Sequence, residues 1–191
     1  MQVIENNIKR VSLTNSKDLI YKSNSLARSK YDITLVQARF IAFLSSFVDK
    51  DDEDFFTYQI QVKPVLDFLE IDRTNLKYLS NTLKQLQTTL ICLQDDDEAE
   101  AYATFLSFFK LDKKNELLEF RFDSSLKKHY VQLKNNFTTL EIANYKKFES
   151  IFTIKIYEFI KSNFQLYKKY ENSLFREFII DTDEFRSKIA S

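Results

Sequence analysis

The sequence contains no glycine and no tryptophan, and it has one proline, one cysteine and one histidine among its 191 residues. Without glycine, the chain lacks the glycine-rich loops with which P-loop and dinucleotide-binding proteins hold phosphates. Its tight turns must be made by Asn, Asp, Lys and Ser, which adopt left-handed backbone conformations less easily than glycine does. The single cysteine excludes an intramolecular disulfide and fits a reducing compartment, so we expect a cytoplasmic protein.

Groupings typical of catalytic or metal sites are also missing. His129 alone cannot form a metal cluster or a paired-histidine nicking site. Cys92 lies in an apolar run, so we expect an inert core thiol. The acidic runs 49–54 and 95–100 lack the spacing and the glycine of a calcium loop, which favours solvated turns. Since no nucleophile, base and orienting group come together, we expect no enzymatic activity, no metal and no cofactor.

Charge and hydropathy exclude two further classes of protein. The chain has 28 basic and 28 acidic residues, so its net charge is zero and any contact with nucleic acid requires a local basic patch. No apolar run approaches the length of a membrane span, and the polar N-terminus does not resemble a signal peptide. A hydrophobic content of 44%, with 19 Phe and 10 Tyr, predicts a globular protein with an aromatic core.

One stretch, residues 73–94, contains no acidic residue at all. Its leucines recur at steps of three and four residues, which predicts a helix with one leucine-lined face. These leucines are Leu76, Leu79, Leu83, Leu86 and Leu90. The opposite face collects cations and amides, a composition that suits an anionic surface with hydrogen-bonding edges, such as DNA. The alternative is a solvated helix face that merely lacks acids.

The elements before this stretch predict a helix-turn-helix. Apolar residues from 35 to 48 indicate a buried central helix, which begins with a capping box of Thr34 and Gln37. Alternation over residues 56–62 predicts a strand, and Pro64 starts a short helix. The acid-free helix follows after a turn and completes the motif.

The elements after it predict a wing and a second unit. A strand over 89–93 is followed by strands over 101–111 and 116–122, and the latter two form a hairpin with Lys113 and Lys114 at its tip. Flanking these, we expect an extended N-terminal arm over 1–30 with a short helix or strand near 11–21, a helix over 123–133 and a polar link over 135–144. A long helix over 145–170 and a strand with a capped helix over 178–191 would follow.

Two runs of the sequence resemble plasmid replication initiators that bind iterons. Residues 21–47 resemble the opening of these proteins, with Ser-Asn-x-Leu at Ser23–Leu26 and a helix of the pattern Ile-Thr-x-x-x-x-Arg ending at Arg39. Residues 148–160, FESIFTIKIYEFI, are similar to the helix that opens the family's second winged helix. The middle elements match in order, so the resemblance covers residues 18–189 and rests on hydrophobic patterns rather than catalytic signatures.

The resemblance implies two tandem winged helices that bind double-stranded DNA at origin repeats, a homodimer that converts to a monomer, and contacts with host replication proteins. In such proteins the first domain supplies much of the dimer interface, and the second contributes the stronger recognition helix. This chain ends where that second recognition helix should begin. Either it is a fragment, or its second unit only packs against the first.

We therefore predict an α+β fold: a winged helix-turn-helix domain with its arm over residues 1–140, then a long helix and a partial second winged-helix unit over 141–191. Asn81 or Gln85 would contact adenine, while the lysines would reach guanine or phosphate. Residues near the helix start would position the DNA backbone. The predicted DNA-binding residues are Arg73, Thr74, Lys77, Tyr78, Asn81, Lys84, Gln85, Lys113 and Lys114.

Two alternatives share this fold. A protein-interaction module would dimerise through the apolar strand 101–111 without affinity for DNA, which suits the neutral net charge. A winged-helix transcriptional repressor would use the same recognition helix without the second unit.

Overall fold

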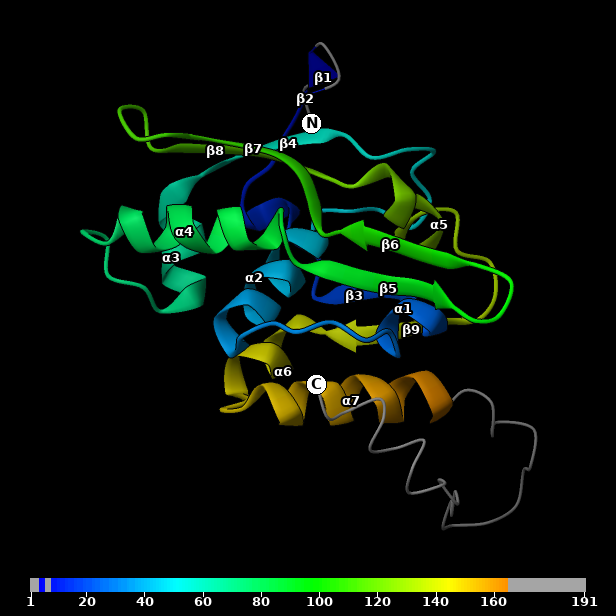
Figure 1. Ribbon diagram of the computed structural model, residues 1–191. Helices are drawn as coiled ribbons and strands as arrows, with labels where there is room; N and C mark the ends of the chain where they lie inside the picture. Colours follow the sequence, from blue (N-terminus) through cyan, green and yellow to red (C-terminus); the bar gives the residue numbers. More distant parts are fainter. Residues whose placement is uncertain (1–3, 6–7, 165–191) are drawn as a thin grey trace.

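The apolar run after Thr34 forms the central helix of the fold. The computed structural model describes residues 4–5 and 8–164, and in it α2 (Leu35–Ser45) lies between a sheet and α7 (Ile151–Phe164) (Figure 1). The Thr34 hydroxyl accepts the Gln37 N–H, and the Gln37 side chain accepts the Thr34 N–H at 2.7 Å, which confirms the capping box. Residues 40–45 are all buried, as expected for a helix that carries apolar residues on all its faces.

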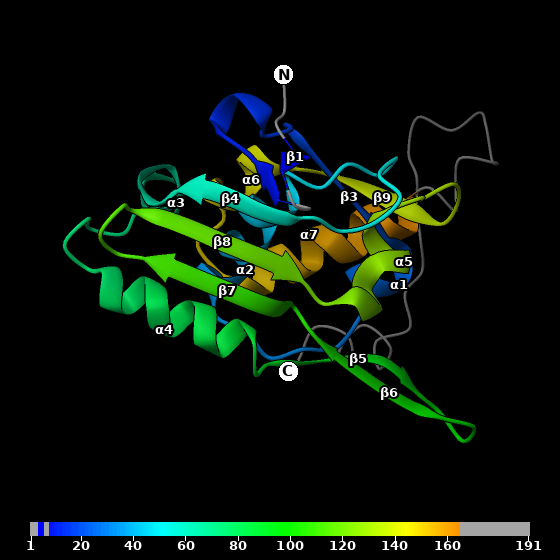
Figure 2. The same cartoon turned by 90° about the horizontal axis from the view of Figure 1, so that it is seen from above.

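A five-stranded sheet covers one side of α2, as the view from above shows (Figure 2). Its order is β1 (Ile4–Glu5), β2 (Ile8–Arg10), β4 (Thr57–Gln61), β8 (Leu117–Phe122) and β7 (Leu106–Asp112). Strands β2 and β4 run parallel and the other pairs antiparallel. Tyr58 and Ile60 point into the core, because alternate residues of a strand face the same side.

The N-terminal segment is built into the fold, so the expectation of an extended arm is wrong. Strand β2 joins the sheet, and β3 (Leu19–Ser23) pairs antiparallel with β9 (Phe137–Glu141). A 3-10 turn (Leu13–Asn15) and the short helix α1 (Asn24–Ala27) complete this segment. Strand β9 also overturns the polar link expected over 135–144. Thr138 and Leu140 are both buried, so the buried face of this strand includes a threonine, and its apolar alternation was not visible in the sequence.

The acidic run 49–54 fastens the N-terminal segment and is more than a solvated turn. Lys9 Nζ lies 3.2 Å from Asp52, and Lys17 Nζ lies 2.5 Å from Asp49. Lys9 is buried, and its ammonium group also lies 5.0 Å from the centre of the Phe56 ring. The acids balance cations that arrive from distant sequence, which the sequence pattern could not show.

The predicted strand 101–111 is two strands. It breaks at the buried Phe105 into β6 (Glu100–Thr104) and β7, because β6 pairs with β5 (Leu90–Asp95) while β7 pairs with β8. Asp123 accepts the Ser125 N–H at 2.8 Å, but it begins only a 3-10 turn (Ser124–Leu126) and α5 (Lys127–Tyr130), shorter than the predicted helix.

The long helix expected over 145–170 is also interrupted. Helix α6 (Ile142–Lys147) and α7 (Ile151–Phe164) are separated at residues 148–150. The Arg39 guanidinium donates to the carbonyl groups of Tyr145, Lys146 and Phe148 at 2.8 to 3.1 Å. These are carbonyl groups that a helix end leaves without partners, so Arg39 stabilises the break.

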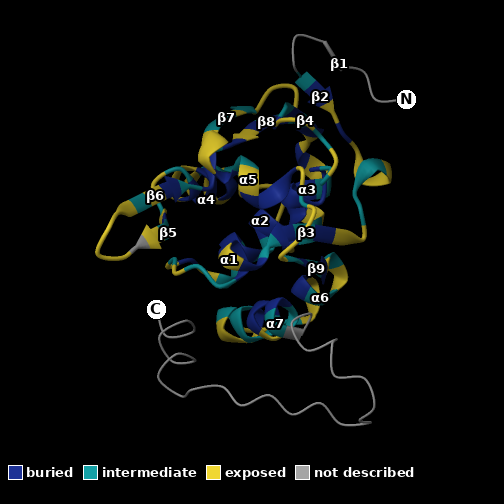
Figure 3. Ribbon diagram, turned by 90° about the vertical axis from the view of Figure 1, so that its right-hand side faces the viewer, coloured by how far each residue is buried: buried dark blue, intermediate teal, exposed yellow. Residues whose placement is uncertain are grey.

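The C-terminal elements pack on the same core as the winged helix. Tyr145 of α6 and Ile154 of α7 belong to the hydrophobic cluster that surrounds α2 (Figure 3). The strand and helix expected over 178–191, and the end of the long helix, lie outside the described residues. The division near residue 140 and the second winged-helix unit therefore stay predictions.

Turns without glycine rest on unexpected residue types. Among the described residues, Glu70, Glu116, Gln132 and Asn136 have positive φ angles between 51° and 57°. Of these, Asn136 alone belongs to the types that the sequence favoured. A left-handed conformation costs an ordinary residue about 1–2 kcal/mol, so the tertiary structure imposes these turns.

Candidate nucleic-acid interface

Helix α4 (Leu76–Leu86) is the element from which a nucleic-acid interface can be built. It follows α3 (Val62–Leu69), which begins before Pro64, so the proline stands in the first turn, where its missing N–H costs nothing. Asn75 caps α4 by accepting the Tyr78 N–H at 3.1 Å. Helix α4 ends at Leu86, and β5 begins at Leu90, close to the strand predicted over 89–93.

The leucine face anchors α4 in the core. Leu79, Leu83 and Leu86 are fully buried, and Leu76 is half-buried. Leu90 was expected on the same face, but it lies in β5 and is 59% exposed, because the helix ends four residues earlier. Burial of three leucines is worth about 1.5–3 kcal/mol each, which fixes the rotation of the helix about its axis.

This rotation turns the predicted cation-and-amide face outward. Lys77, Asn81, Lys84 and Gln85 are all exposed, and Tyr78 is 42% exposed. The side chains of Lys77, Asn81 and Lys84 make no hydrogen bond or ion pair with the described part of the chain. Their donors and acceptors are therefore available to a partner.

Gln85 differs from its neighbours because its side chain is already engaged. Its Oε1 accepts a hydrogen bond from Gln37 Nε2 at 3.0 Å, and Gln37 is buried in the capping box of α2. A bidentate contact with adenine uses both the oxygen and the nitrogen of an amide. Asn81 has both atoms free, so the geometry favours Asn81 between the two amides that the sequence left open.

The turn before α4 is stiffened by its own hydrogen bonds. The Thr74 hydroxyl and N–H both donate to Asp72 Oδ1, at 2.6 and 2.8 Å, and these bonds hold the pKa of Asp72 below its ordinary value. Arg73 lies 3.6 Å from Asp67, but both side chains are more than half exposed, so this pair is weak. Arg73 can release Asp67 and bind a phosphate instead, whereas the hydroxyl and N–H of Thr74 are already hydrogen-bonded to Asp72 within the turn.

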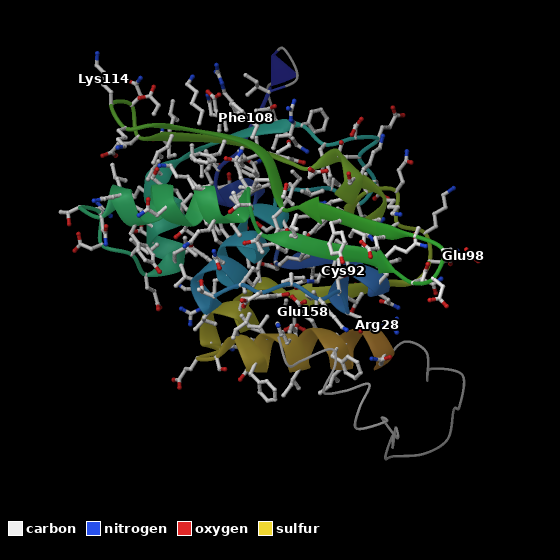
Figure 4. The ribbon with its side chains drawn as sticks, viewed as in Figure 1. Arg28, Cys92, Glu98, Phe108, Lys114 and Glu158 are labelled. Carbon is white, nitrogen blue, oxygen red and sulfur yellow. The ribbon has the colours of Figure 1, made fainter. Side chains whose placement is uncertain are left out.

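The wing places two further cations on the same side of the molecule. Its tip, between β7 and β8, lies beside the N-terminal end of α4 in both ribbon views, and Lys114 extends outward from it (Figures 1, 2 and 4). Asp112 shapes the tip by accepting the N–H groups of Lys114 and Asn115, both at 3.0 Å. Lys113 and Lys114 are exposed, as predicted.

Lys63 joins this group, and sequence reasoning missed it. It is exposed on α3 and lines a cavity of about 90 Å³ together with Arg73, Leu76 and Glu116. In the sequence Lys63 is an isolated cation at the start of a helix, so only the packing of α3 against the wing and the turn reveals its position. Glu116 is the acid at this point, which limits the positive potential there.

The structure also places the single cysteine and the single histidine. Cys92 is half-buried and lines a cavity, so the expectation of a core thiol is wrong; its neighbour Ile91 takes the core position. His129 is 6% exposed, and burial, followed by Lys128, lowers its pKa to about 4. Within residues 4–5 and 8–164, no group of three or more His, Cys, Asp and Glu side chains could hold a metal ion, and no helix could span a membrane.

Comparison with known proteins points in one direction. A family model described as "Initiator Replication protein, WH1" matches residues 19–161. No curated protein matches the chain. Among solved structures, the Pi initiator protein in complex with iteron DNA superposes with a TM-score of 0.65 at 18% identity. That match covers 91% of this chain and 73% of the Pi chain, and at this identity it shows a shared fold.

Proposed function

The chain belongs to the replication initiator protein family, and from this premise we propose that it binds duplex DNA at repeated origin sequences through α4 and the wing. The observation that carries the proposal is the exposed face of α4. It presents Lys77, Asn81 and Lys84 without an acid among them, on a helix whose leucines fix its orientation. The Pi initiator, whose solved structure is a complex with iteron DNA, is consistent with this assignment.

Different residues of the interface would contact the bases and the DNA backbone. Asn81, whose amide is free, would pair with an adenine edge in the major groove, which is wide enough for an α-helix. Lys77 and Lys84 would reach guanine or phosphate. Lys113 and Lys114 would neutralise phosphates that flank the groove, with Arg73 doing so before the helix. Gln85 is less free to turn both amide atoms toward one base, because its oxygen already accepts a hydrogen bond from Gln37.

The remaining partners follow from the family rather than from contacts in the structure. We propose a homodimer in the cytoplasm that contacts host replication proteins and catalyses no reaction. A specific feature supports self-association as a second function. Strand β7 is an edge of the five-stranded sheet, and it carries the half-buried Phe108 and Phe109 (Figure 4). An edge strand can pair with another chain. A stable dimer that binds no DNA would favour an interaction module.

Selection from a random duplex library, followed by fluorescence anisotropy on the enriched duplex, tests the DNA proposal. The wild-type chain should enrich a repeated motif, and Lys77→Ala/Lys84→Ala should bind it about tenfold or more weakly, since two phosphate or base contacts are lost. Lys134→Ala/Lys147→Ala is the matched control, because it removes two exposed cations outside α4 and the wing. Equal losses in both variants would show nonspecific charge attraction and would contradict the proposed interface.

A further inference from the structure

A second polar cavity lies apart from α4 and the wing. It has a volume of about 690 Å³ and is walled by α1 and the residues after it, by β5, and by residues around α5 and the loop that precedes β9. Arg28 and Cys92 mark it in Figure 4, away from Lys114 on the wing. Its size falls within the range of about 300–1,000 Å³ that is usual for small-molecule sites.

Three cations and no acid line this cavity among the described residues. The cations are Arg28, Lys30 and Lys128, and the other lining residues are serine, asparagine, glutamine, leucine and cysteine. The absence of acids is notable in a chain whose charges balance. By contrast, Lys127, next to Lys128 in sequence, lies 3.3 Å from Asp54.

The three cations keep their donors free. Lys30 and Lys128 are exposed and make no hydrogen bond or ion pair with the described part of the chain. Arg28 uses Nε to donate to the Asn24 carbonyl at 3.1 Å, which orients the guanidinium group and leaves its two terminal nitrogens for a ligand. Guanidinium nitrogens in this arrangement match the paired oxygens of a phosphate group.

Hydrogen bonds between distant segments hold the walls in place. The Cys92 N–H donates to the Lys30 carbonyl at 3.1 Å, which ties β5 to the segment after α1. His129 Nδ1 lies 2.7 Å from the Ser23 hydroxyl, which ties α5, and with it Lys128, to the start of α1. The cations therefore come from elements that are fixed relative to one another before any ligand binds, which lowers the entropic cost of binding.

We propose that this cavity binds a small, multiply charged phosphate compound, of the class of nucleoside triphosphates and inorganic polyphosphates. Three cations on two walls, Arg28 and Lys30 on one and Lys128 on another, fit an extended chain of phosphates better than a single anion. Among the described lining residues none is aromatic, so no ring is available to stack on a base. Recognition therefore depends on the phosphates, and ATP and GTP should bind alike. This proposal goes beyond DNA binding and does not depend on it.

Isothermal titration calorimetry with inorganic tripolyphosphate tests the proposal on the full chain at low ionic strength, where screening is weak. The wild-type protein should bind one equivalent. Lys30→Ala/Lys128→Ala should weaken binding by about tenfold or more, since each lysine contributes a charge-assisted contact. Lys77→Ala/Lys84→Ala removes the same charge from α4 and should leave the tripolyphosphate affinity unchanged.

The crossed design separates this proposal from the DNA proposal. Loss of tripolyphosphate binding in the first variant, with duplex binding lost in the second, supports two independent sites. No binding at millimolar tripolyphosphate, or equal weakening in both variants, overturns the proposal. If Lys30→Ala/Lys128→Ala instead weakens duplex binding and wild type ignores tripolyphosphate, the cavity is part of the DNA interface and the assignment is wrong. Thermal melts of both variants verify that the fold is intact.

Discussion

The buried ion pair between Lys22 and Glu158 makes the most quantitative prediction about stability. Lys22 Nζ lies 2.6 Å from Glu158 Oε2, and the two side chains are 7% and 4% exposed. The Tyr145 hydroxyl donates to the other carboxylate oxygen, Oε1, at 2.5 Å, and the Tyr31 hydroxyl donates to Oε2 at 3.4 Å. Burial, with the charge of Glu158 second, raises the pKa of both tyrosines well above the ordinary value, so both hydroxyls stay protonated.

Replacing Glu158 by glutamine keeps the shape but leaves the Lys22 ammonium group buried without a counter-charge. At 2.6 Å and an effective dielectric constant of about 20, the pair attracts by roughly 6 kcal/mol before desolvation is subtracted. The adjoining cavity of about 20 Å³ has room for about one water, so hydration compensates only in part for the lost carboxylate. We expect Glu158→Gln to lower the free energy of unfolding by about 3–5 kcal/mol.

Urea denaturation and thermal melts measure this loss. In a chain of this length, 3–5 kcal/mol corresponds to a fall in Tm of roughly 6–20 °C. Glu149→Gln makes the same chemical change at an exposed position and should alter stability by less than about 0.5 kcal/mol. Lys22→Met/Glu158→Gln should recover most of the loss, because the unpaired charge is gone. A loss below about 1 kcal/mol in Glu158→Gln would refute the reasoning.

Three other predictions concern His129, Gln132 and Asn81. The pKa of His129 falls from 6.5 to about 4 on folding, so between these pH values the unfolded chain binds a proton that the folded chain does not. The free energy of unfolding should therefore drop by on the order of 3 kcal/mol as pH falls from about 6.5 to 4. Urea titrations should show a flatter pH dependence for His129→Asn. Gln132→Gly should raise the free energy of unfolding by about 0.5–1 kcal/mol, because φ is 55° there. Asn81→Ala should lower discrimination for one adenine by about 1–3 kcal/mol in competition binding.

Each of these has a matched control. The lowered pKa values of Asp49 and Asp54 affect stability below about pH 3.8, outside the range of pH 4 to 6.5 in which His129 acts. If the stability of His129→Asn depends on pH in that range as steeply as that of wild type, His129 is not the group responsible. Ser125→Gly introduces glycine at an exposed position without a positive φ angle and should not stabilise the chain. Gln85→Ala should alter base preference less than Asn81→Ala, and the reverse order would contradict the role given to Asn81.

The sequence was sufficient for the elements whose patterns are local. The leucine spacing predicted α4 and its exposed face, and Thr34 with Gln37 predicted the start of α2. These predictions held because helix periodicity and capping depend on residues within one or two turns. The exposure of the five predicted site residues on α4 follows from the same helix periodicity. Their contact with DNA stays a prediction.

Long-range pairing explains what the sequence could not provide. Strand β9 forms because β3, more than a hundred residues earlier, pairs with it. The break between α6 and α7 depends on Arg39, which lies on α2. The cavity near Arg28 combines cations from distant segments, and none of them stands out in its own stretch. The engagement of Gln85 by Gln37 likewise requires two helices to meet.

The salt dependence of duplex binding tests the central claim most directly. Affinity of the wild-type chain and of Lys77→Ala/Lys84→Ala for the selected duplex should be measured across a series of salt concentrations. If both lysines contact phosphates, the negative slope of log K against log salt should be smaller in magnitude by about 2 in the variant, since each lost contact reduces the magnitude by about 1. An unchanged affinity together with an unchanged slope would contradict the claim that α4 enters DNA.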